Sequence, residues 1–196
     1  MTGGHGNNGM AHGIAGPLAV LSLALRAGIS VPGQEEAVST FATWLDRRGT
    51  HYWSTAAHLD TEQPSARDPV RQSWCYGRPG IARAQQLAAP ALGDPARRGT
   101  AEDTVATILT DPLHLTQITD STLCHGWAGL LTLARAVAAD SLAPARFAPI
   151  IQDLHQRLAG GWGRLPKSGF MEGRAGAQLA LHATDTTGWS RALLLT

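Results

Sequence analysis

Two stretches decide the fold of this sequence: Trp74-Cys-Tyr-Gly-Arg-Pro-Gly80 and Leu123-Cys-His-Gly-Trp-Ala-Gly129. Each contains a glycine pair spaced Gly-x-x-Gly, and the same pair recurs in Met10-Ala-His-Gly-Ile-Ala-Gly16 and Phe170-Met-Glu-Gly-Arg-Ala-Gly176. Successive pairs are about fifty residues apart, with a longer first interval, and this period is typical of helical-hairpin repeats. Glycines at the start of a helix permit a close backbone approach or a positive φ.

Each glycine pair precedes a run of small and aliphatic residues that is apolar on almost every side. Such runs predict inner helices, because a helix without a polar face must be buried all round; they cover residues 18–27, 81–89, 130–139 and 177–183. Amphipathic stretches between them predict outer helices with one wet face: 35–47, 101–109 and 147–158. The irregular segment 49–69 predicts a short hairpin or loop. The fold class is therefore all-α, in a single domain over residues 1–196.

Charge and hydropathy exclude several functional classes. Sixteen Lys and Arg balance fifteen Asp and Glu, for a net charge of +1, so we expect no nucleic-acid partner. The longest uncharged apolar stretch, residues 14–25, is shorter than the ~20 residues that span a bilayer, so we expect no membrane insertion. The first ten residues lack the basic and apolar regions of a secretory signal. We therefore expect a cytoplasmic protein.

The reactive side chains of the repeats fall into two columns just before the glycine pairs. One column contains His12, Tyr76, His125 and Glu172, and the column before it contains Ala11, Cys75, Cys124 and Met171. If the inner helices stand around one axis, equivalent positions meet at one end of it. We therefore expect Cys75 and Cys124 to converge although they are far apart in the chain.

Cys75, Cys124 and His125 form a soft set of three ligands that suits Zn²⁺ with a fourth position open. The alternatives are two unconnected buried thiols or a disulfide, and the shared repeat register favours the metal. His12 is in the same column as His125, which favours a role in proton transfer over that of a hydrogen-bonded core histidine. Arg71 precedes Cys75 by four residues and shares its face if a helix begins near residue 68; the alternative is a surface ion pair.

The four segments resemble the signature repeats of LanC-type lanthionine cyclases, and Gly188-Trp-Ser-Arg-Ala-Leu-Leu-Leu resembles the C-terminus of that family. The family domain is longer and forms an α/α toroid. The resemblance implies that this chain is a partial toroid of about four repeats, corresponding to the C-terminal part of the domain. It also implies a zinc site made of Cys75, Cys124 and His125.

The resemblance further implies a reaction. In the family, a peptide cysteine thiolate adds to dehydroalanine or dehydrobutyrine in the same peptide, which closes a lanthionine thioether ring. His12, Arg71 and Tyr76 match other active-site positions of the family. We expect His12 to transfer a proton, Arg71 to stabilise the enolate and Tyr76 to position the substrate or a water. The family also uses an aspartate from its N-terminal half, which has no matching motif here.

These expectations define the partners. The substrate would be a dehydrated precursor peptide, and the partner would be a complementary N-terminal half, a modifying enzyme or a second copy of the chain. The unpaired flanks of a partial toroid would be covered by the N-terminal half, by the second copy or by rearranged local packing. The flanks expected to be left unpaired carry Leu18, Val20, Leu21, Leu179 and Leu181.

Alternative functions remain open at this point. One is a relative that adds glutathione to dehydrated residues, and another is a non-catalytic subunit that binds dehydrated peptides. A third is a prenyltransferase β-type subunit, which the adjacent Cys124 and His125 and the four glycine rims disfavour.

Overall fold

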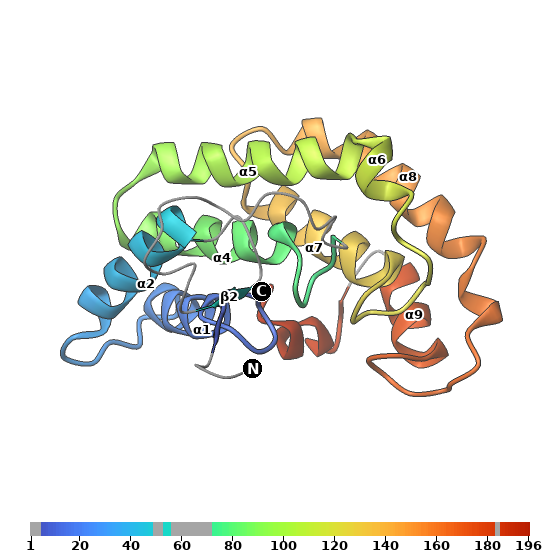
Figure 1. Ribbon diagram of the computed structural model, residues 1–196, viewed down its shortest axis with the longest axis horizontal. Helices are drawn as coiled ribbons and strands as arrows, with labels where there is room; N and C mark the ends of the chain where they lie inside the picture. The colour runs from blue at the N-terminus through green and yellow to red at the C-terminus, as the bar shows by residue number, and fades with distance from the viewer. Residues whose placement is uncertain (1–4, 49–52, 56–71, 183–184) are drawn as a thin grey trace.

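The computed structural model describes residues 5–48, 53–55, 72–182 and 185–196. Four helices form the inner layer: α1 (Ala15–Arg26), α4 (Arg78–Ala91), α7 (Trp127–Asp140) and α9 (Arg174–Leu181). The outer layer consists of α2 (Gln34–Arg48), α5 (Pro95–Thr110) and α8 (Ala148–Ala159). The inner helices follow one another around a curve with the outer helices outside them (Figure 1). This arrangement confirms the all-α fold of helical hairpins predicted from the repeats.

Short elements complete the chain. A one-turn helix, α6 (Pro112–Leu115), follows α5, and three 3₁₀ helices are η1 (Pro144–Phe147), η2 (Trp162–Arg164) and η3 (Trp189–Leu193). Strand β1 (His5–Asn7) pairs antiparallel with β2 (Trp53–Thr55), with Gly6 opposite Ser54. Of the segment 49–69, which is expected to form a short hairpin or loop, the structure describes β2, which pairs with a strand near the N-terminus. The rest of that segment lies outside the described residues.

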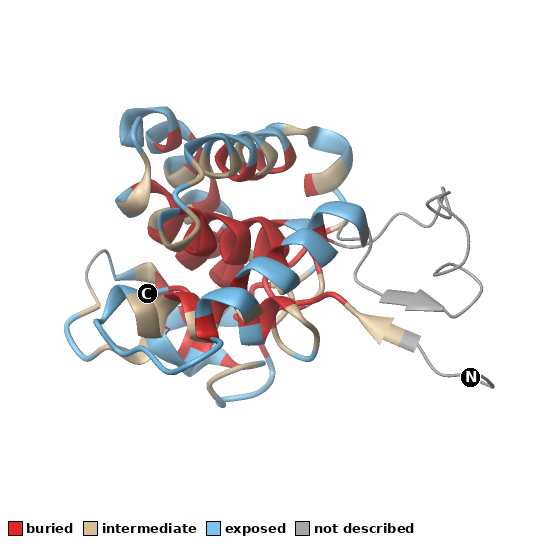
Figure 2. Cartoon of the chain, turned by 90° about the vertical axis from the view of Figure 1, so that its left-hand side faces the viewer, coloured by how far each residue is buried: buried red, intermediate tan, exposed pale blue. Residues whose placement is uncertain are grey.

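The core lies around α4 and α7, the two middle helices of the inner layer (Figure 2). Every residue of α4 from Pro79 to Ala89 is buried, as the lack of a wet face predicted. In α1, by contrast, Leu18 is fully buried while Val20 is 47% exposed. The expectation that Leu18 lies on an unpaired flank is wrong, because the α1 face that carries it packs into the core.

The outer helices bury one stripe each. In α8, Ile150, Leu154 and Leu158 are buried, and their spacing of four residues keeps them on one face. Helix α5 begins after Asp94, whose side chain accepts a hydrogen bond from the Arg97 N–H at 2.9 Å, as expected of an N-cap residue. Among the described residues, no helix combines the length and the apolar character needed to cross a membrane.

The second glycine of each pair is explained by close packing. A Cβ atom added to Gly80, Gly129 or Gly176 would collide with the carbonyl oxygen of the residue six positions earlier in the chain. The expectation of a positive φ in the pairs is not met. Within the described residues, the glycines with positive φ lie elsewhere, at Gly28, Gly33, Gly93 and Gly188.

The last residues of the chain pack into the inner layer. The indole of Trp74 donates a hydrogen bond to the Leu193 carbonyl at 2.8 Å. The Arg83 guanidinium is only 1% exposed and donates a hydrogen bond to the Leu195 carbonyl at 3.1 Å. Leu193 and Leu195 are fully buried. The C-terminal segment is therefore part of the core and supports α4 and the turn before it.

Candidate metal centre

The four turns that precede the inner helices lie next to one another in chain order. The Ala11 N–H of the first turn donates to the Cys75 carbonyl of the second at 3.2 Å, and the Cys124 N–H of the third donates to the Met171 carbonyl of the fourth at 3.0 Å. Each bond joins residues of the same repeat column. Between the second and third turns, ligand atoms of Cys75 and Cys124 lie within 4.8 Å of each other, which confirms the convergence expected from the repeat register.

The turns before α4 and α7 are shaped by hydroxyl groups. The Tyr76 N–H donates to the Ser73 hydroxyl at 3.3 Å, and the His125 N–H donates to the Thr122 hydroxyl at 3.1 Å. Both are local side-chain bonds that turns favour. In the second of them, the Thr122 hydroxyl in turn donates to Asp120 Oδ1 at 2.7 Å. These bonds fix the backbone that presents the cysteines and His125.

Three donor atoms meet between these turns. One ligand atom each of Cys75, Cys124 and His125 lies within 4.8 Å of the other two. The Cys75 sulfur is 3.0 Å from Nδ1 of His125. Cys75 is buried and Cys124 is half-buried, and both are free thiols. The arrangement is a compact sulfur and nitrogen cluster instead of the unconnected thiols or disulfide that the sequence left as alternatives.

The electrostatics of the two thiols are opposite. A hydrogen bond with Cys124 lowers the pKa of Cys75 to about 6, and Ser73 and His125 act in the same direction against the effect of burial. The same hydrogen bond, together with burial, raises the pKa of Cys124. Two sulfurs this close do not both ionise without a compensating cation. A soft divalent cation provides that compensation, so the donor set fits Zn²⁺.

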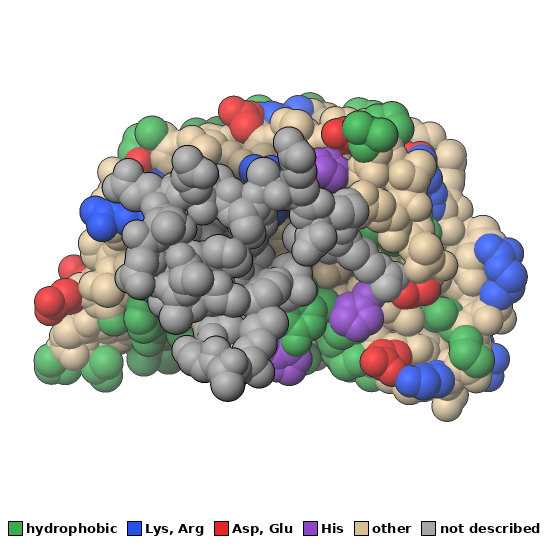
Figure 3. Space-filling view, in the orientation of Figure 1, with side chains coloured by type: hydrophobic (Ala, Val, Ile, Leu, Met, Phe, Trp, Pro, Cys, Tyr) green, Lys and Arg blue, Asp and Glu red, His purple; other side chains and the backbone are tan. Residues whose placement is uncertain are grey.

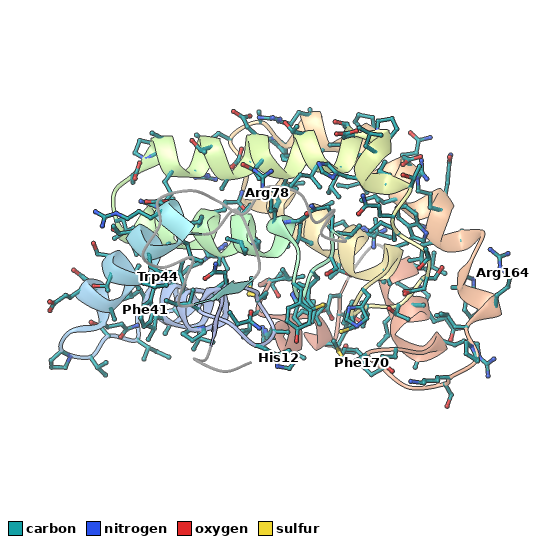
Figure 4. All side chains as sticks on the ribbon, viewed as in Figure 1. His12, Phe41, Trp44, Arg78, Arg164 and Phe170 are labelled. Atoms are coloured by element: carbon teal, nitrogen blue, oxygen red, sulfur yellow. The ribbon has the colours of Figure 1, made fainter. Side chains whose placement is uncertain are left out.

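The turns before the inner helices form one rim, and two other residues singled out in the sequence, His12 and Tyr76, lie in these turns. His12 is exposed, and its ring centroid is 5.5 Å from that of half-buried Tyr76. His12 and Phe170, from the first and the fourth turns, lie on the same side of the inner helices (Figure 4). Glu172 is exposed and forms an ion pair with Lys167. Arg71 lies outside the described residues.

The surface seen in Figure 3, which shares the orientation of Figure 4, is mixed in character. Histidine side chains lie next to apolar ones there, with acidic and basic side chains nearby.

Sequence reasoning missed the groups that support the ligands, namely Ser73, Asp120 and Thr122. The available signal was the repeat register, because Ser73 and Thr122 each precede a cysteine by two residues. Arg83 was missed as well, since nothing near it in the sequence indicates that it binds the C-terminal segment.

Comparison with known proteins agrees with this architecture. The family model described as "Lanthionine synthetase C-like protein" matches residues 1–194. The nisin biosynthesis protein NisC of Lactococcus lactis subsp. lactis is 25% identical over an alignment of 205 positions, which covers 96% of this chain and 48% of that protein. The solved structure of a nisin cyclase superimposes with a TM-score of 0.84 at 24% identity, over 98% of this chain and 50% of the other.

These matches have two consequences. The structural likeness shows that the helical hairpins are those of a LanC-type toroid, and the chain spans about half the length of the relatives that it matches. The family model covers nearly the whole sequence. The chain therefore belongs to the lanthionine synthetase C-like family.

Proposed function

We propose that this chain holds Zn²⁺ through Cys75, Cys124 and His125 and takes part in closing lanthionine rings in a dehydrated precursor peptide. The observation that carries the proposal is the cluster of two sulfurs and one imidazole within 4.8 Å at the rim of the inner helices. Three ligands leave a position for substrate, which is the pattern of catalytic zinc sites. Both relatives above are named for nisin, one as a biosynthesis protein and one as a cyclase.

Zinc supplies one property when bound: it lowers the pKa of a coordinating thiol, so that a substrate cysteine is a thiolate at neutral pH. Cys75 and Cys124 would hold the ion as thiolates, and their negative charges would offset its positive charge, so that the substrate thiolate would stay nucleophilic. The substrate sulfur then attacks the β-carbon of a dehydrated residue, and the α-carbon of that residue must receive a proton.

His12 is the proposed source of this proton. It is exposed at the rim and lies beside the Tyr76 ring, where a bound peptide would lie over both side chains. Imidazole exchanges protons near neutral pH. Tyr76 would position the substrate or a water. Arg71, four residues before Cys75 in the chain, would stabilise the negative charge that develops on the enolate oxygen.

A complementary half of the toroid is the proposed partner. Two observations support it: the chain spans about half of its relatives, and Val20 on α1 is 47% exposed. An apolar side chain on an inner helix is normally covered by the next repeat. That half would also supply the aspartate that the family resemblance implies.

One experiment tests the proposal and separates it from the alternatives. The chain is purified with and without a co-expressed complementary half, its zinc is measured by mass spectrometry, and each sample receives a dehydrated peptide with an internal cysteine. We expect about one zinc per chain and thioether rings once the second half is present. Transfer of added glutathione without ring closure would favour the glutathione-adding alternative. Protein that binds the peptide but closes no ring and transfers no glutathione would favour the non-catalytic one.

A further inference from the structure

We propose that Ser73 is a positioning residue of this metal centre, whose hydroxyl donates a hydrogen bond to the Cys75 sulfur and sets the electron density of that ligand. The inference rests on the proposed function, because it concerns Cys75 as a metal ligand. Ser73 Oγ lies 3.4 Å from Cys75 Sγ, within the reach of a hydrogen bond to sulfur. Ser73 is 2% exposed, so bulk water does not compete for this contact.

The direction of the hydrogen bond follows from the available protons. A cysteine that binds a metal is a thiolate, which can only accept. The Tyr76 N–H already donates to Ser73 Oγ at 3.3 Å, so this oxygen acts as an acceptor toward the backbone. Its single proton is then left to donate, and the Cys75 sulfur is the acceptor that the described residues place beside it.

The equivalent hydroxyl in the next repeat is used differently. Thr122 also precedes its cysteine by two residues and accepts a backbone N–H, that of His125. Its own proton goes to Asp120 Oδ1 at 2.7 Å. In the sequence, the position equivalent to Asp120 is Arg71, whose side chain has no acceptor. The repeat before α4 thus lacks the carboxylate that engages the hydroxyl proton in the repeat before α7.

This difference gives the two cysteine ligands different surroundings. A hydrogen bond to a thiolate stabilises its lone pairs, and in a site shielded from water that effect is not averaged out. Groups that support metal ligands in this way commonly change metal affinity by 10- to 100-fold. Ser73 would therefore hold the Cys75 side chain in its ligand position. Its hydrogen bond would also reduce the electron density that the Cys75 sulfur donates to the metal.

The test uses Co²⁺ alone as a spectroscopic substitute for zinc, because thiolate ligands give cobalt a charge-transfer band in the near ultraviolet. The wild-type chain is compared with Ser73→Ala and Ser73→Thr. Loss of the hydroxyl should move the band to longer wavelength and weaken Co²⁺ binding by about 10- to 100-fold. Ser73→Thr keeps a hydroxyl and should restore both values.

Thr122→Val is the matched control. It also deletes a hydroxyl that accepts a backbone N–H, but that hydroxyl donates to Asp120, so the sulfur band should keep its position. Ser73→Val against Ser73→Thr repeats the comparison at constant side-chain size, and it decides the matter if circular dichroism shows Ser73→Ala to be unfolded.

The outcomes separate the two hypotheses. A band and an affinity that are the same with and without the Ser73 hydroxyl would overturn the role of Ser73 and leave the metal centre standing. Absence of any thiolate band in the wild-type chain would overturn the metal centre and this inference together.

Discussion

The sulfur of Cys75 lies 3.0 Å from Nδ1 of His125, although 50 residues separate them in the chain. The contact exists because two equivalent turns stand side by side at the N-terminal ends of α4 and α7. Neither turn contains all three of the proposed ligands, so the proposed metal site would depend on the packing of these two helices. Loss of the ion should therefore be coupled to loosening of the rim.

Replacement of either cysteine should abolish tight zinc binding. Cys75→Ala and Cys124→Ala each leave two ligands, too few for a stable site. The measurement is zinc content after dialysis against a weak chelator. Full zinc content in both variants would show that the ion is held elsewhere.

His12→Ala should retain zinc and lose ring closure. His12 is exposed at the rim and lies against Tyr76, outside the cluster of donor atoms. Loss of a general acid typically costs about 100-fold or more in rate. The rate of ring closure is measured with the complementary half present, alongside zinc content. Zinc loss as large as that of Cys75→Ala would instead identify His12 as a ligand.

Asp140→Asn should destabilise the fold by about 3 kcal/mol. Asp140 accepts from Arg83, which is 1% exposed, at 2.7 Å, and from Arg26 at 2.6 Å. Without the carboxylate, the buried Arg83 charge loses the anion with which it pairs among the described residues. Urea denaturation at neutral pH measures the difference. Asp103→Asn is the control, because its ion pair with Arg146 is exposed and should matter by less than about 1 kcal/mol.

The ion pairs of Asp140 with Arg83 and Arg26 also predict that the free energy of unfolding depends on pH. Burial alone would raise the pKa of Asp140, but the hydrogen bonds and charges of Arg26 and Arg83 lower it below its ordinary value. A carboxylate with a lowered pKa stabilises the fold fully above its unfolded pKa of about 4 and loses this contribution as the pH falls below that value. The difference between wild type and Asp140→Asn should therefore shrink on acidification. A difference that is constant from neutral pH to pH ~3 would contradict the assignment.

Gly129→Ala should destabilise the chain by about 1–3 kcal/mol, because overpacking forces the backbone apart. Its Cβ would collide with the Leu123 carbonyl oxygen and lie 3.4 Å from the Trp74 Cβ. Gly99→Ala is the matched change, since nothing lies within 4 Å of its added Cβ. In the interior of α5 that alanine should stabilise the chain by about 0.5–1 kcal/mol. Thermal unfolding of both variants provides the comparison, and equal losses would contradict the packing explanation.

The sequence by itself determined the helical repeats and the convergence of Cys75 with Cys124 and His125. The glycine pairs mark where each inner helix begins, and the uniform apolar runs indicate which helices are buried. Because repeats pack with the same geometry, residues at equivalent positions of neighbouring repeats lie close together in space. Cys75 and Cys124 could therefore be placed together without any structure.

Only the tertiary structure decided the features that no register encodes. The Arg83 guanidinium meets the Leu195 carbonyl across 112 residues, and β1 pairs with β2 across the first hairpin. The contact of Ser73 with the Cys75 sulfur is local in sequence. It nevertheless depends on which acceptors the folded turn places beside the Ser73 hydroxyl proton. Such contacts are set by the relative placement of segments without a shared pattern, and the physical reason is that hydrogen bonds require ångström-level geometry, which composition and spacing do not specify.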